Sequence, residues 1–157
     1  MFILALIVHV IAVVLWIGGV AMVTLVILPA VRSLKSAQEQ VELFERIEGR
    51  FAWQARGTTL LAGLSGFYLV GRLGLWSSFD SLQYWWLCAM FAVWLIFTFV
   101  LFVAEPLYLN WAFQHWAKAA PERTFTLVQR LHWLALILSL IAIAGGVAGS
   151  HGLTLFG

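Results

Sequence analysis

The sequence predicts an all-α integral membrane protein, an antiparallel four-helix bundle with up-down-up-down topology formed by a single transmembrane domain. Composition is the first reason, because 63% of the residues are hydrophobic and only 10% are charged. The second is that the apolar residues gather in four stretches, each near or above the roughly 20 residues that a helix needs to cross a bilayer. Short links between successive stretches then place neighbouring helices antiparallel.

The four expected spans differ in the polar segments that separate them. Residues 33–50 carry apolar side chains at three- and four-residue steps, which predicts an amphipathic cytoplasmic helix, an extension of the second span or a solvated connector. Residues 107–123 mix aromatic and polar side chains and are expected at the membrane interface. The expected spans themselves cover residues 2–28, 58–76, 84–104 and 127–149.

Basic residues are distributed unequally between the two sides of these spans. Of the nine Lys and Arg residues, only Arg72 lies on the side of the second connection. The positive-inside rule therefore predicts a multi-pass protein of the bacterial inner membrane, with the first and third connections in the cytoplasm and both termini in the periplasm. No basic patch interleaved with aromatic residues indicates a nucleic-acid partner. The cytoplasmic basic residues are Arg32, Lys35, Arg46, Arg50, Arg56, Lys118, Arg123 and Arg130.

A histidine lies within the first expected span, in the pattern His9-x6-Trp16-Ile-Gly-Gly. An imidazole that faced lipid would have no polar partner, so we expect His9 to point into the bundle. A helical rise of about 1.5 Å per residue places Met90 and Tyr68 at the same depth. Met90 is a candidate second ligand and Tyr68 a candidate hydrogen-bond partner. The Gly145-Gly146 pair, also at that depth, could leave room for a flat cofactor.

His9, Met90, Tyr68 and Trp16 are therefore the candidate cofactor-binding residues, with His9 and Met90 as metal ligands. His/Met ligation is ordinary for the iron of haem b, and soft ligands also suit copper. The alternative is structural: His9 donates one hydrogen bond to a carbonyl of a neighbouring helix, and Met90 fills space. No role is assigned to His115 or His151.

A second group of polar residues is expected at the cytoplasmic ends of the spans. Arg56, Glu105, Arg130 and His132 come to about the same level, near Pro106. An ion pair between Glu105 and Arg56 or Arg130 is the economical interpretation, because an unpaired carboxylate at that depth is costly. The functional alternative is a quinone, haem-propionate or proton-entry site, in which His132 would carry the proton.

The residues of the first span also carry a resemblance to a known family. The run from His9 through Trp16 to Gly18-Gly19 resembles the first helix of the CopD-like copper-resistance membrane proteins, and distantly that of the HemJ-type proteins. The second resemblance implies b-type haem bound through His9, and the first implies copper handling. The chain lacks a lysine in its third span and an Asn-Glu pair in its fourth, so the HemJ enzymatic activity is not carried over.

Three hypotheses of different classes follow. In the first, His9 holds haem b or copper near the periplasmic face, and the protein exchanges electrons with quinone or with a periplasmic redox partner. In the second, the chain is a copper transport or tolerance factor that meets a periplasmic copper protein. In the third, it is a structural subunit or oligomer within a larger membrane complex. An enzymatic activity is left open.

Overall fold

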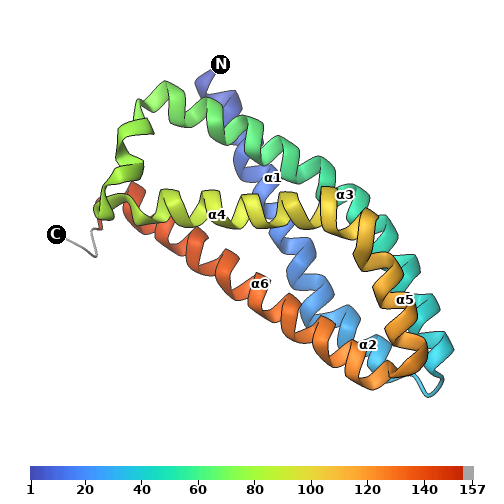
Figure 1. Ribbon diagram of the computed structural model, residues 1–157. Helices are drawn as coiled ribbons and strands as arrows, with labels where there is room; N and C mark the ends of the chain where they lie inside the picture. Colours follow the sequence, from blue (N-terminus) through green and yellow to red (C-terminus); the bar gives the residue numbers. More distant parts are fainter. Residues whose placement is uncertain (154–157) are drawn as a thin grey trace.

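The computed structural model describes residues 1–153, and in that range the chain is helical, with turns and no strands, so the expected all-α class is confirmed there. Figure 1 shows long helical arms joined by tight reversals of the chain. Six α-helices are interrupted or joined by π- and 3-10-helical segments. The α-helices are α1 (Phe2–Met22), α2 (Leu28–Arg32), α3 (Ala37–Leu73), α4 (Trp85–Phe99), α5 (Asn110–Ala119) and α6 (Pro121–Ser150). The π-helical segments are η1 (Val23–Ile27) and η4 (Val100–Leu109), and the 3-10 helices are η2 (Leu75–Asp80) and η3 (Leu82–Tyr84).

Three helical segments within the described range are long and apolar enough to cross a membrane: Phe2–Arg32, Leu82–Ala119 and Pro121–Ser150. The second expected span lies in the C-terminal half of α3, which is not among them. Only residues 57–71 separate the charged side chains of Arg56 and Arg72 there. A helix of that length covers roughly 22 Å, less than the roughly 30 Å of hydrocarbon in a bilayer.

α3 is a single helix of 37 residues, which joins the first polar connection to the second expected span without a break. It begins after Ser36, whose Oγ accepts a hydrogen bond from the backbone N–H of Glu39, an N-terminal cap. It ends at Gly74, which has a φ of 66° in the left-handed region that favours glycine. Trp76, expected at the end of the second span, therefore lies beyond the helix in η2.

The helices pack as two antiparallel pairs that share one core. α1 lies along α3, and α4 lies along α6; contacts between α1 and α6 and between α3 and α4 join the pairs. In Figure 1 the N-terminus lies beside the far end of α3, and the end of α6 lies beside the start of α4. All four helices contribute to one apolar cluster, which includes Trp16, Ile17, Ala62, Phe97 and Leu136. A second cluster, with Leu28, Val31, Phe44 and Phe125, lies where α2, the N-terminal half of α3 and the start of α6 come together.

Each π-helical segment is associated with a proline. In a π-helix the N–H of a residue bonds to the carbonyl five residues earlier. The N–H of Leu28 accordingly donates to the carbonyl of Val23 at the end of η1, and the N–H of Asn110 donates to that of Glu105 at the end of η4. Pro29 follows η1 by two residues, and Pro106 lies within η4. A proline has no N–H, so the carbonyl five residues before each proline lacks its donor in this register.

Side chains from other helices donate to both of these carbonyls. Nε2 of Gln129, on α6, lies 2.8 Å from the carbonyl oxygen of Thr24, five residues before Pro29. Nε of Arg56, on α3, lies 3.0 Å from the carbonyl oxygen of Leu101, five residues before Pro106. Thr24 is fully buried, so its carbonyl could not turn to solvent instead. The pair α4 and α6 thus supplies the donor for η1, and the pair α1 and α3 supplies the donor for η4.

We expect Gln129→Ala to lower the free energy of unfolding by about 1 to 3 kcal/mol, because it leaves the buried Thr24 carbonyl without this donor. In a Pro29→Ala background the loss shrinks, since the new N–H at position 29 reaches the same carbonyl. Pro29 is exposed, so its replacement leaves no cavity. Reversible unfolding in mixed micelles measures the double-mutant cycle. Equal losses in both backgrounds would refute the proposed role of Gln129.

Candidate functional site

His9 is anchored to α3 through one ring nitrogen. Its Nδ1 lies 2.9 Å from the carbonyl oxygen of Ala62 and 3.2 Å from Oγ of Ser65. A carbonyl oxygen only accepts, so the proton of the neutral ring is on Nδ1. The Ser65 hydroxyl donates to a carbonyl of its own helix, which leaves its oxygen free to accept from His9. This arrangement fixes the tautomer and leaves Nε2 with a free lone pair.

The imidazole occupies a space that a glycine provides. A Cβ at Gly66 would lie 3.1 Å from Cε1 of His9, so any larger residue would crowd the ring. His9 itself is half-buried, while its neighbours Ile7, Val10 and Ile11 are exposed at the surface of α1. The ring is therefore held between α1 and α3, near the outer surface of the bundle.

The other candidate residues are seated elsewhere. Met90 packs against α6, because a Cβ at Gly146 would lie 3.1 Å from its Sδ. Tyr68 is 40% exposed on α3, and the hydrogen bonds of residues 1–153 join neither Tyr68 nor Met90 to His9. Trp16 is buried in the core, with its ring 4.9 Å from that of Phe97 in an edge-to-face contact. Its indole N–H has no partner within the described range.

The space expected beside the glycines of α6 is filled by aromatic side chains. The indole of Trp85 lies against Gly145, and that of Trp86 lies against Gly149. The expectation that the Gly145-Gly146 pair leaves room for a flat cofactor is therefore not met in this packing. Residues 1–153 also contain no group of three or more His, Cys, Asp or Glu side chains that could together hold a metal ion. Among the candidate ligands, His9 is the one whose ring is fixed by a hydrogen bond to another helix.

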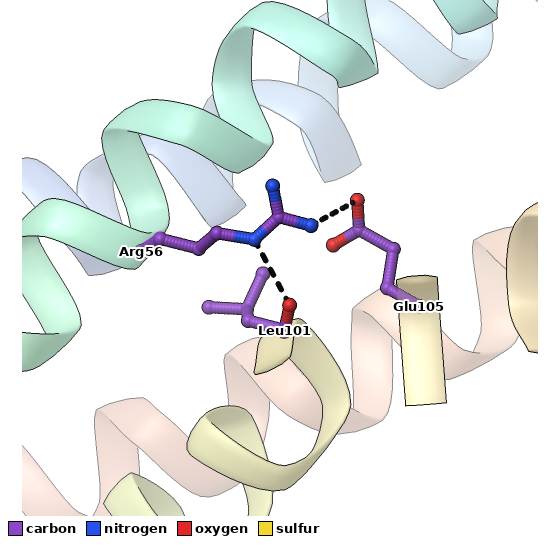
Figure 2. A network of polar contacts seen from close by, with 3 residues as sticks. All are labelled: Arg56, Leu101 and Glu105. Carbon is purple, nitrogen blue, oxygen red and sulfur yellow. Dashed lines mark hydrogen bonds and ion pairs between the residues drawn. The ribbon is translucent and has the colours of Figure 1, made fainter. Parts of the chain in front are cut away.

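The second expected site contains an ion pair that also supports the backbone. Nη2 of Arg56 lies 3.1 Å from Oε1 of Glu105, while its Nε donates to the carbonyl of Leu101 (Figure 2). The side chains of Arg56 and Glu105 are only 20% and 14% exposed. The guanidinium also lies 5.4 Å from the centre of the Trp53 ring, a cation–π contact. Arg56 thus holds the π segment η4 at two points.

The structure brings together two of the four residues expected in this cluster. Nδ1 of His132 donates to the carbonyl of Val128 in its own helix. Arg130 is exposed and lines a hollow on α6, and no ion pair joins it to Glu105 within the described range. Residues two positions apart on a helix point in nearly opposite directions, so Arg130 and His132 could not both face Glu105.

Glu48, which the sequence pattern does not single out, lies on α3 two turns before Arg56. Burial, together with the nearby carboxylates of Glu105 and Glu45, raises the pKa of Glu48 to about 7. In the sequence Glu48 is one of several glutamates in a polar segment that could be a solvated connector. Its position near Glu105 follows only once residues 37–73 are known to form one helix.

Comparisons of the chain with known protein families, with curated proteins and with solved structures find no match. The CopD-like and HemJ-type resemblances therefore stay hypotheses that rest on the residues quoted above.

We expect Arg56→Gln to destabilise the protein by about 3 kcal/mol, because it leaves a buried carboxylate unpaired and removes a donor to the Leu101 carbonyl. Glu105→Gln should cost less, since the amide still accepts from Arg56 and the backbone bond survives. Unfolding of both variants in mixed micelles gives the comparison. An equal or larger loss for Glu105→Gln would contradict the dual role of Arg56.

The raised pKa of Glu48 predicts that stability falls as the pH rises from about 4.5 to about 7, because across this range the unfolded chain ionises Glu48 while the folded protein keeps it protonated. Glu48→Gln should flatten this part of the pH–stability curve and stabilise the protein above pH 7. Glu39→Gln, in the first turn of the same helix, is the matched control. If the two variants show the same curve, Glu48 is not the group that titrates.

Proposed function

We propose that the chain is a multi-pass protein of the bacterial inner membrane, with up-down-up-down topology and both termini in the periplasm. Three helical segments of spanning length and apolarity support a membrane protein. The C-terminal half of α3 serves as a shorter fourth span, shielded along its length by α1. The concentration of Lys and Arg around the first and third connections supports a cytoplasmic location for both.

Within that protein we propose that His9 binds haem b, or alternatively copper, through Nε2. The observation that carries this proposal is the hydrogen bond from Nδ1 of His9 to the Ala62 carbonyl. Metal-ligating histidines almost always donate their other ring N–H in this way, which fixes the ring and raises its basicity. The resemblance of the His9–Gly19 run to the first helix of the CopD-like and HemJ-type proteins agrees with it. Bound there, the metal would supply one-electron chemistry.

The donor set fits a site with one ligand from this chain. Met90, on α4, packs against α6, and indole rings occupy the spaces beside Gly145 and Gly149. Neither a His/Met pair nor a cofactor slot between α4 and α6 is therefore supported. His9 is half-buried near exposed apolar residues of α1, which leaves its surroundings open on one side. A quinone, a periplasmic redox or copper protein, or another copy of the chain would be the partner on that side.

The structural hypothesis is favoured by the same hydrogen bond. A bond from His9 to Ala62 joins α1 to α3, and it stabilises that pair whether or not Nε2 binds anything. In that case the protein is a component of a larger membrane complex. The two functions differ only in the use of Nε2, so the experiment must remove Nε2 and keep the donor at Nδ1.

His9→Asn meets this requirement, because its amide N–H₂ takes the place of Nδ1 and offers no ligand at Nε2. The wild type, His9→Asn and His9→Ala are purified and compared by two measurements. One is the ultraviolet-visible spectrum, oxidised and dithionite-reduced, and the other is elemental analysis. We expect a Soret band, or copper, in the wild type and its loss in both variants. His132→Ala, which removes a histidine bonded to its own helix, is the matched control and should keep the signal.

The structural hypothesis predicts a different set of results. The wild type would then carry neither haem nor copper, and His9→Asn would have the same free energy of unfolding as the wild type. His9→Ala alone would be less stable, by about 1 kcal/mol for one lost hydrogen bond. This outcome would exclude the ligand role of His9.

A further inference from the structure

Three arginine side chains lie around the start of α6, away from the His9 site and from the Arg56–Glu105 pair. Arg123 and Arg130 lie seven residues apart, on the same face of the helix, with Thr126 between them. Arg32, at the end of α2, reaches this face and donates from Nη2 to Oγ1 of Thr126 at 3.2 Å. Glu122 is the acidic residue beside them. The face therefore carries a net positive charge.

Two adjoining hollows of different chemistry lie here. One, of about 340 Å³, is lined by Glu122, Arg123, Thr126, Leu127 and Arg130. The other, of about 350 Å³, lies between the end of α5 and the start of α6, and its apolar lining includes Trp116, Ala119, Ala120 and Leu127. Arg123 and Leu127 line both, so the basic hollow opens directly beside the apolar one.

The position of the hollows indicates what they meet in a membrane. They lie at the N-terminal end of Pro121–Ser150, one of the segments long and apolar enough to cross a bilayer. Trp116, which is 42% exposed, is a residue type typical of the membrane interface. A ligand with an anionic group and an apolar chain would match both hollows at once, whereas a free anion would use only the basic one.

We propose that this surface is a specific binding site for an anionic phospholipid of the cytoplasmic leaflet. The phosphate group lies between Arg123 and Arg130, beside Thr126 and within reach of Arg32. An acyl chain follows Leu127 and Trp116 along the apolar hollow. The basic hollow, of about 340 Å³, is open to the surface, so a phosphate group can enter it from outside. Guanidinium groups suit phosphate because their N–H donors form paired hydrogen bonds.

The site is tested by titrating the detergent-purified protein with dioleoyl phosphatidylglycerol, dioleoyl phosphatidylcholine or inorganic phosphate. Retained lipid is counted by native mass spectrometry, and the thermal shift is recorded in parallel. We expect tight retention of one phosphatidylglycerol, little phosphatidylcholine and no effect of phosphate. Arg123→Gln with Arg130→Gln should weaken phosphatidylglycerol binding roughly tenfold or more. Leu127→Ser should weaken it without changing the charge.

The matched control is Arg46→Gln with Arg50→Gln, which removes the same charge from exposed positions of α3. It should change the affinity by less than about twofold, and both double variants should melt like the wild type without lipid. Equal losses in the two double variants would overturn the proposal in favour of diffuse attraction. Competition by inorganic phosphate that is independent of Leu127 would overturn it in favour of a free-anion site. His9→Ala should bind the lipid normally, which separates this site from the proposed cofactor site.

Discussion

The constraint on which the rest of the structure depends is the hydrogen bonding of two backbone carbonyls that prolines leave without a donor. An unsatisfied carbonyl costs several kcal/mol in hydrocarbon, so a membrane helix with a proline needs a partner for it. Thr24 and Leu101 obtain theirs from Gln129 and Arg56. Because each donor comes from the other helical pair, neither π segment is complete until the two pairs have docked. The bundle is therefore specified by polar bonds as well as by its apolar core.

Arg56 links this backbone requirement to the electrostatics around Glu105 and Glu48. A guanidinium has five N–H donors, which lets one side chain bond the Leu101 carbonyl and the Glu105 carboxylate together. The Glu105 side chain is thereby held near Glu48, and burial, together with the carboxylates of Glu105 and Glu45, raises the pKa of Glu48 to about 7. A change in the protonation of Glu48 therefore acts on Glu105, whose ion pair with Arg56 helps to hold η4 in place. π-helical segments often occur at functional sites, and this one has a titratable group beside it.

The sequence was informative where a single stretch of chain decides the structure. Apolar runs predict the helical arms, and a pairing of Glu105 with Arg56 is one of two that charge and depth allow. What it could not supply is the rotation of one helix against another. Met90 is expected at the depth of His9 but packs against Gly146, and Arg130 is expected at the depth of Glu105 but lines a hollow on α6. The sequence also left the continuity of α3 open, as one of three alternatives for residues 33–50. The polarity of residues 37–55 resembles that of a connection, and tertiary contacts with α1, α2 and α5 support the helix there.

Glycines in this bundle provide room for rings. The indoles of Trp85, Trp86 and Trp94 lie against Gly145, Gly149 and Gly63, and the ring of Phe51 lies against Gly19. Small residues between membrane helices more usually serve close backbone approach. Gly66 belongs to the same pattern, but the ring it accommodates is the imidazole of His9. Trp94 donates its one N–H to the Thr59 carbonyl, as His9 donates its Nδ1–H to the carbonyl of Ala62. An indole then has no second nitrogen, whereas an imidazole keeps one, and this difference is the chemical basis for the proposal that His9 is a ligand.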